Sequence, residues 1–315
     1  MERPRFSIVA PAFNEEETLP EFYRQVRAVM DEVGEPWELI LVNDGSTDGT
    51  SEVAERLHKE DPRVRVIEFA RNFGHQIAIT AGMDHAQGDA VITIDCDLQD
   101  PPEVISDLVA RWREGYQVVY GVRAEREGET WFKLFTARLF YRLIGALTDV
   151  QIPMEAGDFR LLDRQVVEDL RRMRERRRFI RGMTSWVGYR QIGVPYVRHP
   201  RFAGETKYPF RKMFRLALDA ITGFSDLPLK LAWLIGFSLL VLGVLLGSVL
   251  LILRFSGTAP LAGQGLMLTV ALLLGGVQLV FVGILGEYLA RIYDEVRGRP
   301  LYTVARRIGF EDQRR

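Results

Sequence analysis

The sequence predicts an α/β fold with a mostly parallel, Rossmann-like sheet, followed by a carboxyl-terminal pair of membrane-spanning helices. Two observations lead to this prediction. In the first third of the chain, short apolar runs alternate with helical patterns, which is typical of parallel sheets. Near the carboxyl end, two long stretches contain no charged residue. The 315 residues are enough for one globular domain of about 220 residues plus this apolar pair.

The first two predicted strands each end in an acidic turn. The first strand ends at a turn containing Glu15, and a helical pattern follows over residues 16–33. The second, residues 39–42, ends at Asp44, before a helical pattern over residues 51–59. In parallel sheets, ligands bind in the crevice at the carboxyl ends of the strands. Both acidic turns are therefore expected at that crevice.

The third predicted strand, residues 90–94, ends in an acidic cluster. Asp95 and Asp97 follow directly, and because strand side chains alternate, both point the same way. Two carboxylates at the carboxyl edge of a parallel sheet are suited to hold a hard divalent cation that bridges phosphates. We therefore expect Glu15, Asp44 and Asp95 to converge on one crevice.

The apolar segments near the carboxyl end predict a transmembrane hairpin. Residues 231–253 and 255–286 are uncharged, and a membrane-spanning helix needs about 20 apolar residues. The predicted spans are 231–253 and 265–287. Basic residues such as Lys230 and Arg291 flank the outer ends, so the positive-inside rule places both of these ends in the cytoplasm.

Four parts are therefore predicted along the chain. Residues 1–207 form a cytosolic catalytic domain, 208–228 an amphipathic juxtamembrane helix, 229–290 the two membrane spans, and 291–315 a cytosolic tail. The apolar stripe of the juxtamembrane helix could instead pack on the catalytic domain, but its position before a span favours the membrane interface.

Composition narrows the class of protein and its location. A formal net charge of −1 argues against a nucleic-acid partner. Cys96 is the only cysteine, so no disulfide can form within the chain and a reducing compartment is expected. The amino terminus enters the first strand without an apolar signal region. We expect a multi-pass membrane protein with its globular domain and both termini in the cytoplasm.

Several motifs distributed over nearly the whole chain point to one family. The most specific are Asp97-Leu98-Gln99-Asp100-Pro101-Pro102-Glu103 and Gly157-Asp158-Phe159-Arg160. Others are Asn43-Asp44-Gly45-Ser46, Arg71-Asn72-Phe73-Gly74-His75-Gln76, Thr206-Lys207-Tyr208 and Gly286-Glu287-Tyr288. With these motifs the chain resembles the inverting family-2 glycosyltransferases with a GT-A fold. It resembles most closely the polyprenyl-phosphate glycosyltransferases, such as undecaprenyl-phosphate glucosyltransferases and relatives of dolichyl-phosphate mannose synthase.

This resemblance implies inverting transfer of a hexose from a nucleotide sugar to polyprenyl (undecaprenyl) phosphate at the cytoplasmic membrane face. UDP-glucose is the expected donor, and GDP-mannose and a UDP-aminoarabinose remain alternatives. A processive polysaccharide synthase is a weaker reading, since its usual Gln-x-x-Arg-Trp motif is missing. A lipid-binding protein would leave the acidic crevice unexplained, and a nucleotidyltransferase would leave the hairpin unexplained. The resemblance also implies a homo-oligomer, namely a tetramer.

The resemblance further implies roles for individual residues. The expected base is Asp158. Because a phosphate monoester has a second pKa of about 6 and is largely ionised at neutral pH, a role for Asp158 in orienting the acceptor or the sugar stays open. A structural role as a loop carboxylate also stays open. The expected metal ligands for Mg²⁺ or Mn²⁺ are Asp95, Asp97 and Gln99, and Asp97 is counted as catalytic. The expected nucleotide-sugar residues are Pro11, Phe13, Glu15, Val42, Asp44, Asp95, Cys96 and Arg123.

Cations are also expected on the acceptor side, because two anions must approach each other during transfer. Arg201, Lys207 and Arg211 precede the membrane segment and are the acceptor-phosphate candidates. Two other features are interpreted as structural. The arginines of residues 171–178 are expected on a solvated helix face, and no metal-ligand spacing supports a ligand role for His75.

Overall fold

The computed structural model describes residues 3–123, 156–198, 227–255 and 264–310. These residues form two compact units. The sheet unit consists of the described residues up to Arg198 together with Pro300–Phe310, and the helical unit consists of the described residues 227–299. The acceptor candidates Arg201, Lys207 and Arg211 lie outside the described residues, as does the predicted juxtamembrane helix up to residue 226.

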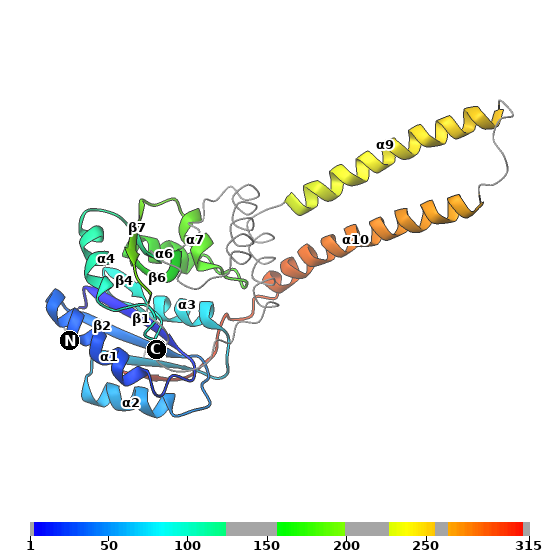
Figure 1. Ribbon diagram of the computed structural model, residues 1–315. Helices are drawn as coiled ribbons and strands as arrows, with labels where there is room; N and C mark the ends of the chain where they lie inside the picture. The colour runs from blue at the N-terminus through cyan, green and yellow to red at the C-terminus, as the bar shows by residue number, and fades with distance from the viewer. Residues whose placement is uncertain (1–2, 124–155, 199–226, 256–263, 311–315) are drawn as a thin grey trace. The chain divides into compact units, whose positions relative to one another are not determined.

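Within the described residues, eight strands form one mixed sheet in the order β7-β5-β6-β4-β1-β2-β3-β8 (Figure 1). β1 lies parallel to β2 and β4, β2 to β3, and β5 to β7, whereas β6 and β8 are antiparallel to their neighbours. The bounds are Phe6–Ala12 for β1, Trp37–Asn43 for β2, Val64–Phe69 for β3, Ala90–Thr93 for β4, Val118–Arg123 for β5, Ala156–Asp163 for β6, Gln191–Tyr196 for β7 and Val304–Ile308 for β8. The predicted mostly parallel α/β sheet is confirmed.

Helices cover both faces of this sheet (Figure 1). The bounds are Leu19–Val33 for α1, Thr50–Glu60 for α2, His75–His85 for α3, Val104–Arg113 for α4, Arg164–Arg172 for α6 and Ile180–Trp186 for α7. Successive side chains of β1 point to opposite faces of the sheet. Phe6 and Ile8 pack in the core on the face that α1, α2 and α4 cover. Val9 points instead at α3, where a Cβ on Gly82 would lie 2.1 Å from Val9 Cγ1. Only glycine fits that contact.

Local sequence explains the bounds of α1. Leu19, Phe22, Val26 and Met30 recur at helical spacing and are buried, so one face of the helix packs on the sheet. The helix ends at Gly34, whose φ of +74° and N–H bond to the Met30 carbonyl form a left-handed cap. The helix predicted over residues 16–33 is therefore found, with a start three residues later, at Leu19.

The solvated face predicted for the arginines of residues 171–178 is found only in part: Arg172, Arg174 and Arg177 are exposed, but for Arg171 and Arg178 the interpretation was wrong. Arg171 donates to the carbonyls of Met83 and Ala86 at the end of α3, and Arg178 is buried and donates to the Leu170 carbonyl. The last carbonyls of a helix have no partner within the helix, and these guanidinium groups satisfy them. Arg172, with a side chain 81% exposed, is solvated as expected.

Residues 291–315 were predicted to be a cytosolic tail, with no strand. In the structure, β8 lies antiparallel to β3 and extends the sheet at that edge. Arg306 of β8 forms ion pairs of 2.8 Å with Glu55 and Glu68. After the helical unit, the chain therefore returns to the sheet unit.

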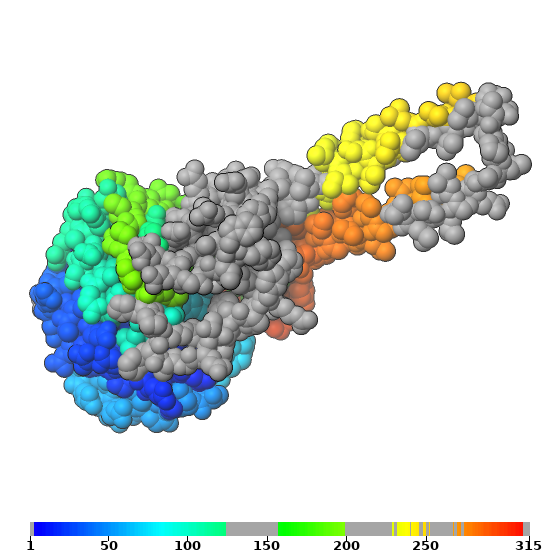
Figure 2. Space-filling model, in the orientation of Figure 1, coloured from blue at the N-terminus to red at the C-terminus, as the bar shows by residue number. Residues whose placement is uncertain are grey.

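The helical unit consists of two long helices, α9 (Leu227–Phe255) and α10 (Gln264–Val296). Figure 2 shows them touching along part of their length, where a Cβ on Gly236 would lie 3.6 Å from the Phe281 ring. By length and composition, one stretch of the described residues, Leu274–Val296, could cross a membrane. A second apolar stretch, Ala232–Leu245, is shorter. The membrane hairpin stays a prediction.

Candidate active site

The acidic turns predicted to converge lie at one edge of the sheet. β2, β1 and β4 are neighbours and run parallel, so their carboxyl ends share that edge. Burial raises the pKa of the Cys96 thiol well above its ordinary value. The negative charges of Glu15, Asp95 and Asp97 raise it further, which means that all three lie near this thiol.

The nucleoside residues predicted on β1 and β2 are brought together. Pro11 and Val42 are direct partners in the parallel register, and Phe13 is 46% exposed in the turn after β1. Asn14 in the same turn has a φ of +58°, and its side-chain oxygen accepts the N–H of Thr47 from the turn after β2. The two turns are therefore tied to each other. The predicted contacts with a nucleoside stay a prediction.

Asp44 holds the loop between β3 and α3, residues 70–74. It is 3% exposed, and its two carboxylate oxygens accept the N–H groups of Phe73 at 2.6 Å and Gly74 at 2.9 Å. Burial raises the pKa of Asp44 against the opposing effect of these bonds. Next to it, Gly45 has a φ of +68°, and a Cβ there would lie 2.5 Å from the Arg71 carbonyl carbon. This loop is thus seated closely on the turn after β2.

His75, interpreted from the sequence as structural, lies between two carboxylates of the predicted site. Its Nε2 is 3.5 Å from Asp95 and 3.4 Å from Asp158. Burial alone would lower the pKa of His75, but the charges of these two carboxylates outweigh it and raise the pKa to about 9. The imidazole is therefore a cation at neutral pH. Its place in the motif of residues 71–76 was the signal that could have identified it.

Asp158, the predicted base, is paired with an arginine that the sequence analysis missed. Arg181 Nε and Nη2 donate to its two oxygens at 2.9 and 3.0 Å, and Gln76 donates to one of them at 3.2 Å. Burial would raise the pKa of Asp158, but Arg181 and His75 together hold it well below its usual range. The carboxylate is therefore ionised at neutral pH and is a weak proton acceptor in this arrangement.

Two side chains fix α7, the helix that carries Arg181. The side-chain Oε1 of Gln76 accepts the N–H of Ile180 at 3.0 Å. Buried Arg160 of β6 donates to the Thr184 hydroxyl at 2.5 Å and to the Gly157 carbonyl at 2.7 Å. Burial lowers the pKa of Arg160 to about 10, so it remains charged. These bonds hold α3, β6 and α7 in one arrangement around Asp158.

Arg123 belongs to a second group of side chains at the end of β5. It is the register partner of Tyr196 on β7 and hydrogen-bonds the Tyr196 hydroxyl. That hydroxyl donates to buried Asp100 at 2.5 Å, and Arg198 lies 3.3 Å from the same carboxylate. Burial and Asp100 raise the pKa of Tyr196. Asp100, Tyr196 and Arg198 were not predicted. Tyr196 orients Arg123, whose Nη2 would lie 3.6 Å from a Cβ on Gly157.

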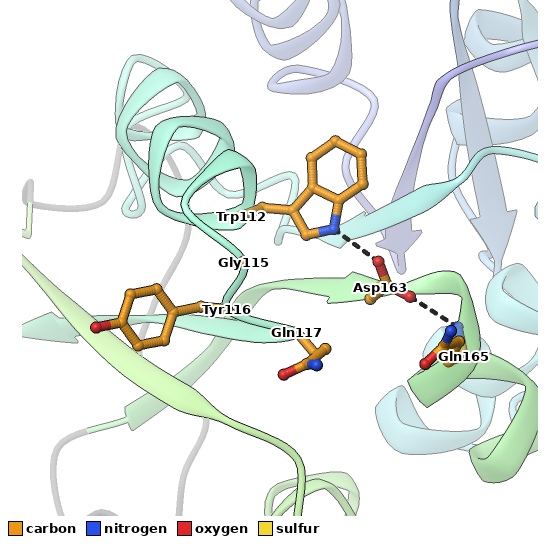
Figure 3. A pocket seen from close by; sticks show the side chains of 6 residues that line it. All are labelled: Trp112, Gly115, Tyr116, Gln117, Asp163 and Gln165. Atoms are coloured by element: carbon orange, nitrogen blue, oxygen red, sulfur yellow. Dashed lines mark hydrogen bonds between the residues drawn. The ribbon is translucent and has the colours of Figure 1, made fainter.

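A hollow of about 170 Å³ lies elsewhere on the sheet unit and contains none of the predicted site residues (Figure 3). It is lined by Trp112, Gly115, Tyr116, Gln117, Asp163 and Gln165. Asp163 accepts hydrogen bonds from the Trp112 indole at 2.8 Å and from the Gln165 N–H at 3.0 Å, so its carboxylate is used by the fold. The hollow adds nothing to the acidic crevice.

Comparison with known proteins decides the family. Residues 7–171, more than half of the chain, match the model described as Glycosyl transferase family 2. The chain belongs to this family. The mixed sheet is accordingly the GT-A-like fold that the sequence motifs implied, and the protein is a glycosyltransferase.

Full-length relatives agree with this assignment. The chain is 49% identical to "Uncharacterized glycosyltransferase YkcC" of Bacillus subtilis (strain 168), covering 98% of this chain and 96% of the relative. It is 42% identical to the SfII prophage-derived bactoprenol glucosyl transferase of Shigella flexneri, over 95% and 97% of the two chains. It is 40% identical to the prophage bactoprenol glucosyl transferase homolog of Escherichia coli (strain K12), over 96% and 99%.

Similar solved structures include mannosyl-3-phosphoglycerate synthase from Rubrobacter xylanophilus, with 16% identity and a TM-score of 0.48 over 69% of this chain and 72% of that one. Another is glucosyl-3-phosphoglycerate synthase from Mycobacterium tuberculosis in complex with Mn²⁺, UDP and glucosyl-3-phosphoglycerate, with 22% identity and a TM-score of 0.47 over 70% and 78%.

The turn after β4 offers this glycosyltransferase oxygen donors for a cation. Asp97 Oδ1 accepts the N–H of Gln99 at 3.1 Å, and Leu98 between them has a φ of +58°. Burial raises the pKa of Asp95 to about 6, and a bound cation would favour its ionised form. Among the described residues, no three His, Cys, Asp or Glu side chains gather as a metal site. Two carboxylates fit Mg²⁺ or Mn²⁺ only when substrate phosphates and waters complete the coordination.

Proposed function

We propose that this family-2 glycosyltransferase transfers glucose from UDP-glucose to a polyprenyl phosphate, giving a polyprenyl-monophosphate sugar. The observation that carries this proposal is the likeness, over at least 95% of the chain, to proteins named bactoprenol glucosyl transferase at 40–42% identity. The likeness extends over the sheet unit and both long helices. A likeness confined to the sheet unit would have supported sugar transfer without indicating the acceptor.

The proposed donor site lies at the carboxyl edge of β1, β2 and β4. Pro11, Phe13 and Val42 would contact the nucleoside, and Arg123 would contact the diphosphate. Asp95 and Asp97, with Gln99, would hold a divalent cation, which neutralises the charge that grows on the diphosphate leaving group. This arrangement needs substrate phosphate as a ligand, in agreement with the small number of carboxylates in the turn after β4.

The proposed reaction is a single inverting displacement. An oxygen of the acceptor phosphate forms a bond to the anomeric carbon while the bond from that carbon to the diphosphate breaks. A phosphate monoester has a second pKa of about 6, so the attacking oxygen is mostly ionised already at neutral pH. The lowered pKa of Asp158 fits a role in orienting Arg181 and His75 rather than in accepting a proton.

The acceptor and membrane parts of the proposal depend on residues beyond the described site. Arg201, Lys207 and Arg211 would bind the acceptor phosphate by charge-assisted hydrogen bonds. α9 and α10 would cross the inner membrane as a hairpin, with the sheet unit and both termini in the cytoplasm. We further propose a homo-oligomer, a tetramer, for the assembled enzyme.

A donor panel tests this function. Purified full-length protein in detergent is incubated with undecaprenyl phosphate and radiolabelled UDP-glucose, GDP-mannose or UDP-4-amino-4-deoxyarabinose, with Mn²⁺ or with excess EDTA. We expect labelled lipid from UDP-glucose in the presence of metal and none in EDTA. Transfer from another donor only would change the assigned sugar. No transfer to lipid phosphate from any donor, together with hydrolysis or transfer to a soluble acceptor, would overturn the proposed acceptor.

A further inference from the structure

The segment that follows α10 does more than extend the sheet, because its first residues contact the loop that precedes His75. The backbone carbonyl of Thr303 accepts the N–H of Ala70 at 3.0 Å, at the start of loop 70–74. The Tyr302 ring stacks on Phe69, the last residue of β3, with centroids 5.2 Å apart and an interplanar angle of 21°. The end of β3 and the start of the loop are therefore held by this carboxyl-terminal segment.

The contact continues from Phe69 into the loop. The rings of Phe69 and Phe73 meet edge to face at 5.5 Å. Phe73 donates its N–H to Asp44, as Gly74 does, and His75 follows directly as the first residue of α3. One side of loop 70–74 is thus held by the turn after β2, and the other by Tyr302 through two ring contacts.

Tyr302 also reaches α3 itself. Its hydroxyl donates to Asp84 Oδ2 at 2.9 Å, near the end of that helix, and its ring lies beside His85 with centroids 6.5 Å apart. Asp84 is in turn paired with Arg174 at 2.8 Å. Tyr302 therefore contacts both elements that meet at the loop, β3 before it and α3 after it.

β8 itself makes a different set of contacts. Arg306 pairs with Glu55 of α2 and Glu68 of β3, and these ion pairs involve no residue of loop 70–74. Covering an exposed sheet edge is sufficient reason for a strand such as β8. It does not explain why the residues before the strand stack on Phe69 and bond to Ala70.

We propose that Tyr302 is a positioning residue for the transfer reaction: it holds loop 70–74 so that His75 stays between Asp95 and Asp158. The role in catalysis depends on the proposed function, whereas the role in holding the loop does not. Truncating the chain after α10 would therefore leave every predicted site residue in place and still impair the site.

Amide hydrogen exchange and turnover on the full-length protein test this proposal. In Tyr302→Ala, exchange of the Phe73 and Gly74 amides should rise roughly tenfold, and kcat should fall by about the same factor. Tyr302→Phe keeps the stacked ring and should restore both values to within about threefold of the unmodified protein. Arg306→Ala is the matched control on the same segment and should change neither by more than about twofold. Peptides from β1 and β2 should exchange as before in all three variants.

Three results would overturn the proposal. Unchanged exchange of residues 70–76 in Tyr302→Ala would mean that Asp44 alone holds the loop. Equal acceleration in Arg306→Ala would reduce the segment to an edge strand. Faster exchange with unchanged kcat would show an anchor without a role in positioning.

If Tyr302→Ala does not fold, Tyr302→Leu, which keeps apolar bulk without a flat ring, gives the same comparison. Absence of lipid transfer in the unmodified protein would count against the proposed function, while the exchange data would still decide the anchor.

Discussion

Removing the Arg181 guanidinium is the most direct perturbation of the site. In Arg181→Ala, Asp158 loses both bonds of a two-pronged ion pair, at 2.9 and 3.0 Å. Among the described residues, the carboxylate then keeps the Gln76 amide at 3.2 Å and the His75 ring at 3.4 Å. Because the Asp158 side chain is 12% exposed, water replaces the lost donors poorly.

The expected cost follows from this burial. Breaking a fully buried ion pair by removing one partner typically costs about 3–5 kcal/mol. Arg181 is 27% exposed, so water can enter the space it leaves, and we expect about 2–3 kcal/mol of unfolding free energy. The pKa of Asp158 is lowered in the folded protein, so this stabilisation is complete above its unfolded value of about 3.9 and is lost as pH falls below that value. The deficit should be constant between pH 6 and 8.

Denaturant unfolding in detergent, followed by tryptophan fluorescence, measures this deficit. Arg172→Ala is the control, because that side chain is 81% exposed and should cost less than about 0.5 kcal/mol. Arg181→Lys should fall between the two, since an ammonium group does not reproduce the planar fork. If Arg181→Ala is no more destabilising than Arg172→Ala, the ion pair contributes nothing in solution, and the account of Asp158 given above is wrong.

Four further outcomes are expected. Asp97→Asn should lower turnover roughly 100-fold without changing the unfolding midpoint, and full turnover of the unmodified enzyme in EDTA would contradict the metal role. Gly82→Ala places a Cβ 2.1 Å from the Val9 side chain and should cost about 1–3 kcal/mol in denaturant unfolding; an unchanged midpoint would refute the close contact. Burial lowers the pKa of His85, so its contribution to stability should be complete above about pH 6.5 and decline as pH falls; His85→Gln should flatten that slope in unfolding measured from pH 7 to 5. Arg201→Ala should raise KM for lipid phosphate about ten- to a hundredfold, and a matching loss of UDP-glucose affinity in calorimetry would assign the residue to the donor.

The three strands that the sequence predicted, those of β1, β2 and β4, are the ones buried along their whole length. Such strands appear in sequence as continuous apolar runs, and this is why residues 39–42 were assigned correctly within β2 and why the prediction of 90–94 extends only one residue beyond β4. β8 could not be predicted in this way. It is a five-residue edge strand containing Arg306 and Arg307, and its partner β3 lies more than 200 residues earlier. Nothing in its own sequence distinguishes it from a basic tail.

The candidate site divides along similar lines. Asp44 and Asp95 were located because they lie one and two residues after strands of the parallel sheet, and topology alone brings strand ends together. His75 and Arg181 were missed because they come from α3 and α7, and a helix can present a side chain in any direction until its packing is known. Sequence therefore predicted which acids gather, but not which cations balance them.

That balance gives a physical reason to expect a metal. Three carboxylates, Asp95, Asp97 and Asp158, lie at the site with the cations His75 and Arg181, so the formal charge of this group is one negative. A nucleotide sugar brings a diphosphate with two more negative charges, and the acceptor phosphate brings up to two further ones. Like charges brought together away from water repel strongly, so these anions need further positive charge before they can meet. A divalent cation at the Asp95–Asp97 turn and basic residues on the acceptor side would supply it, which is why the metal and the arginine and lysine candidates at positions 201, 207 and 211 belong to one proposal.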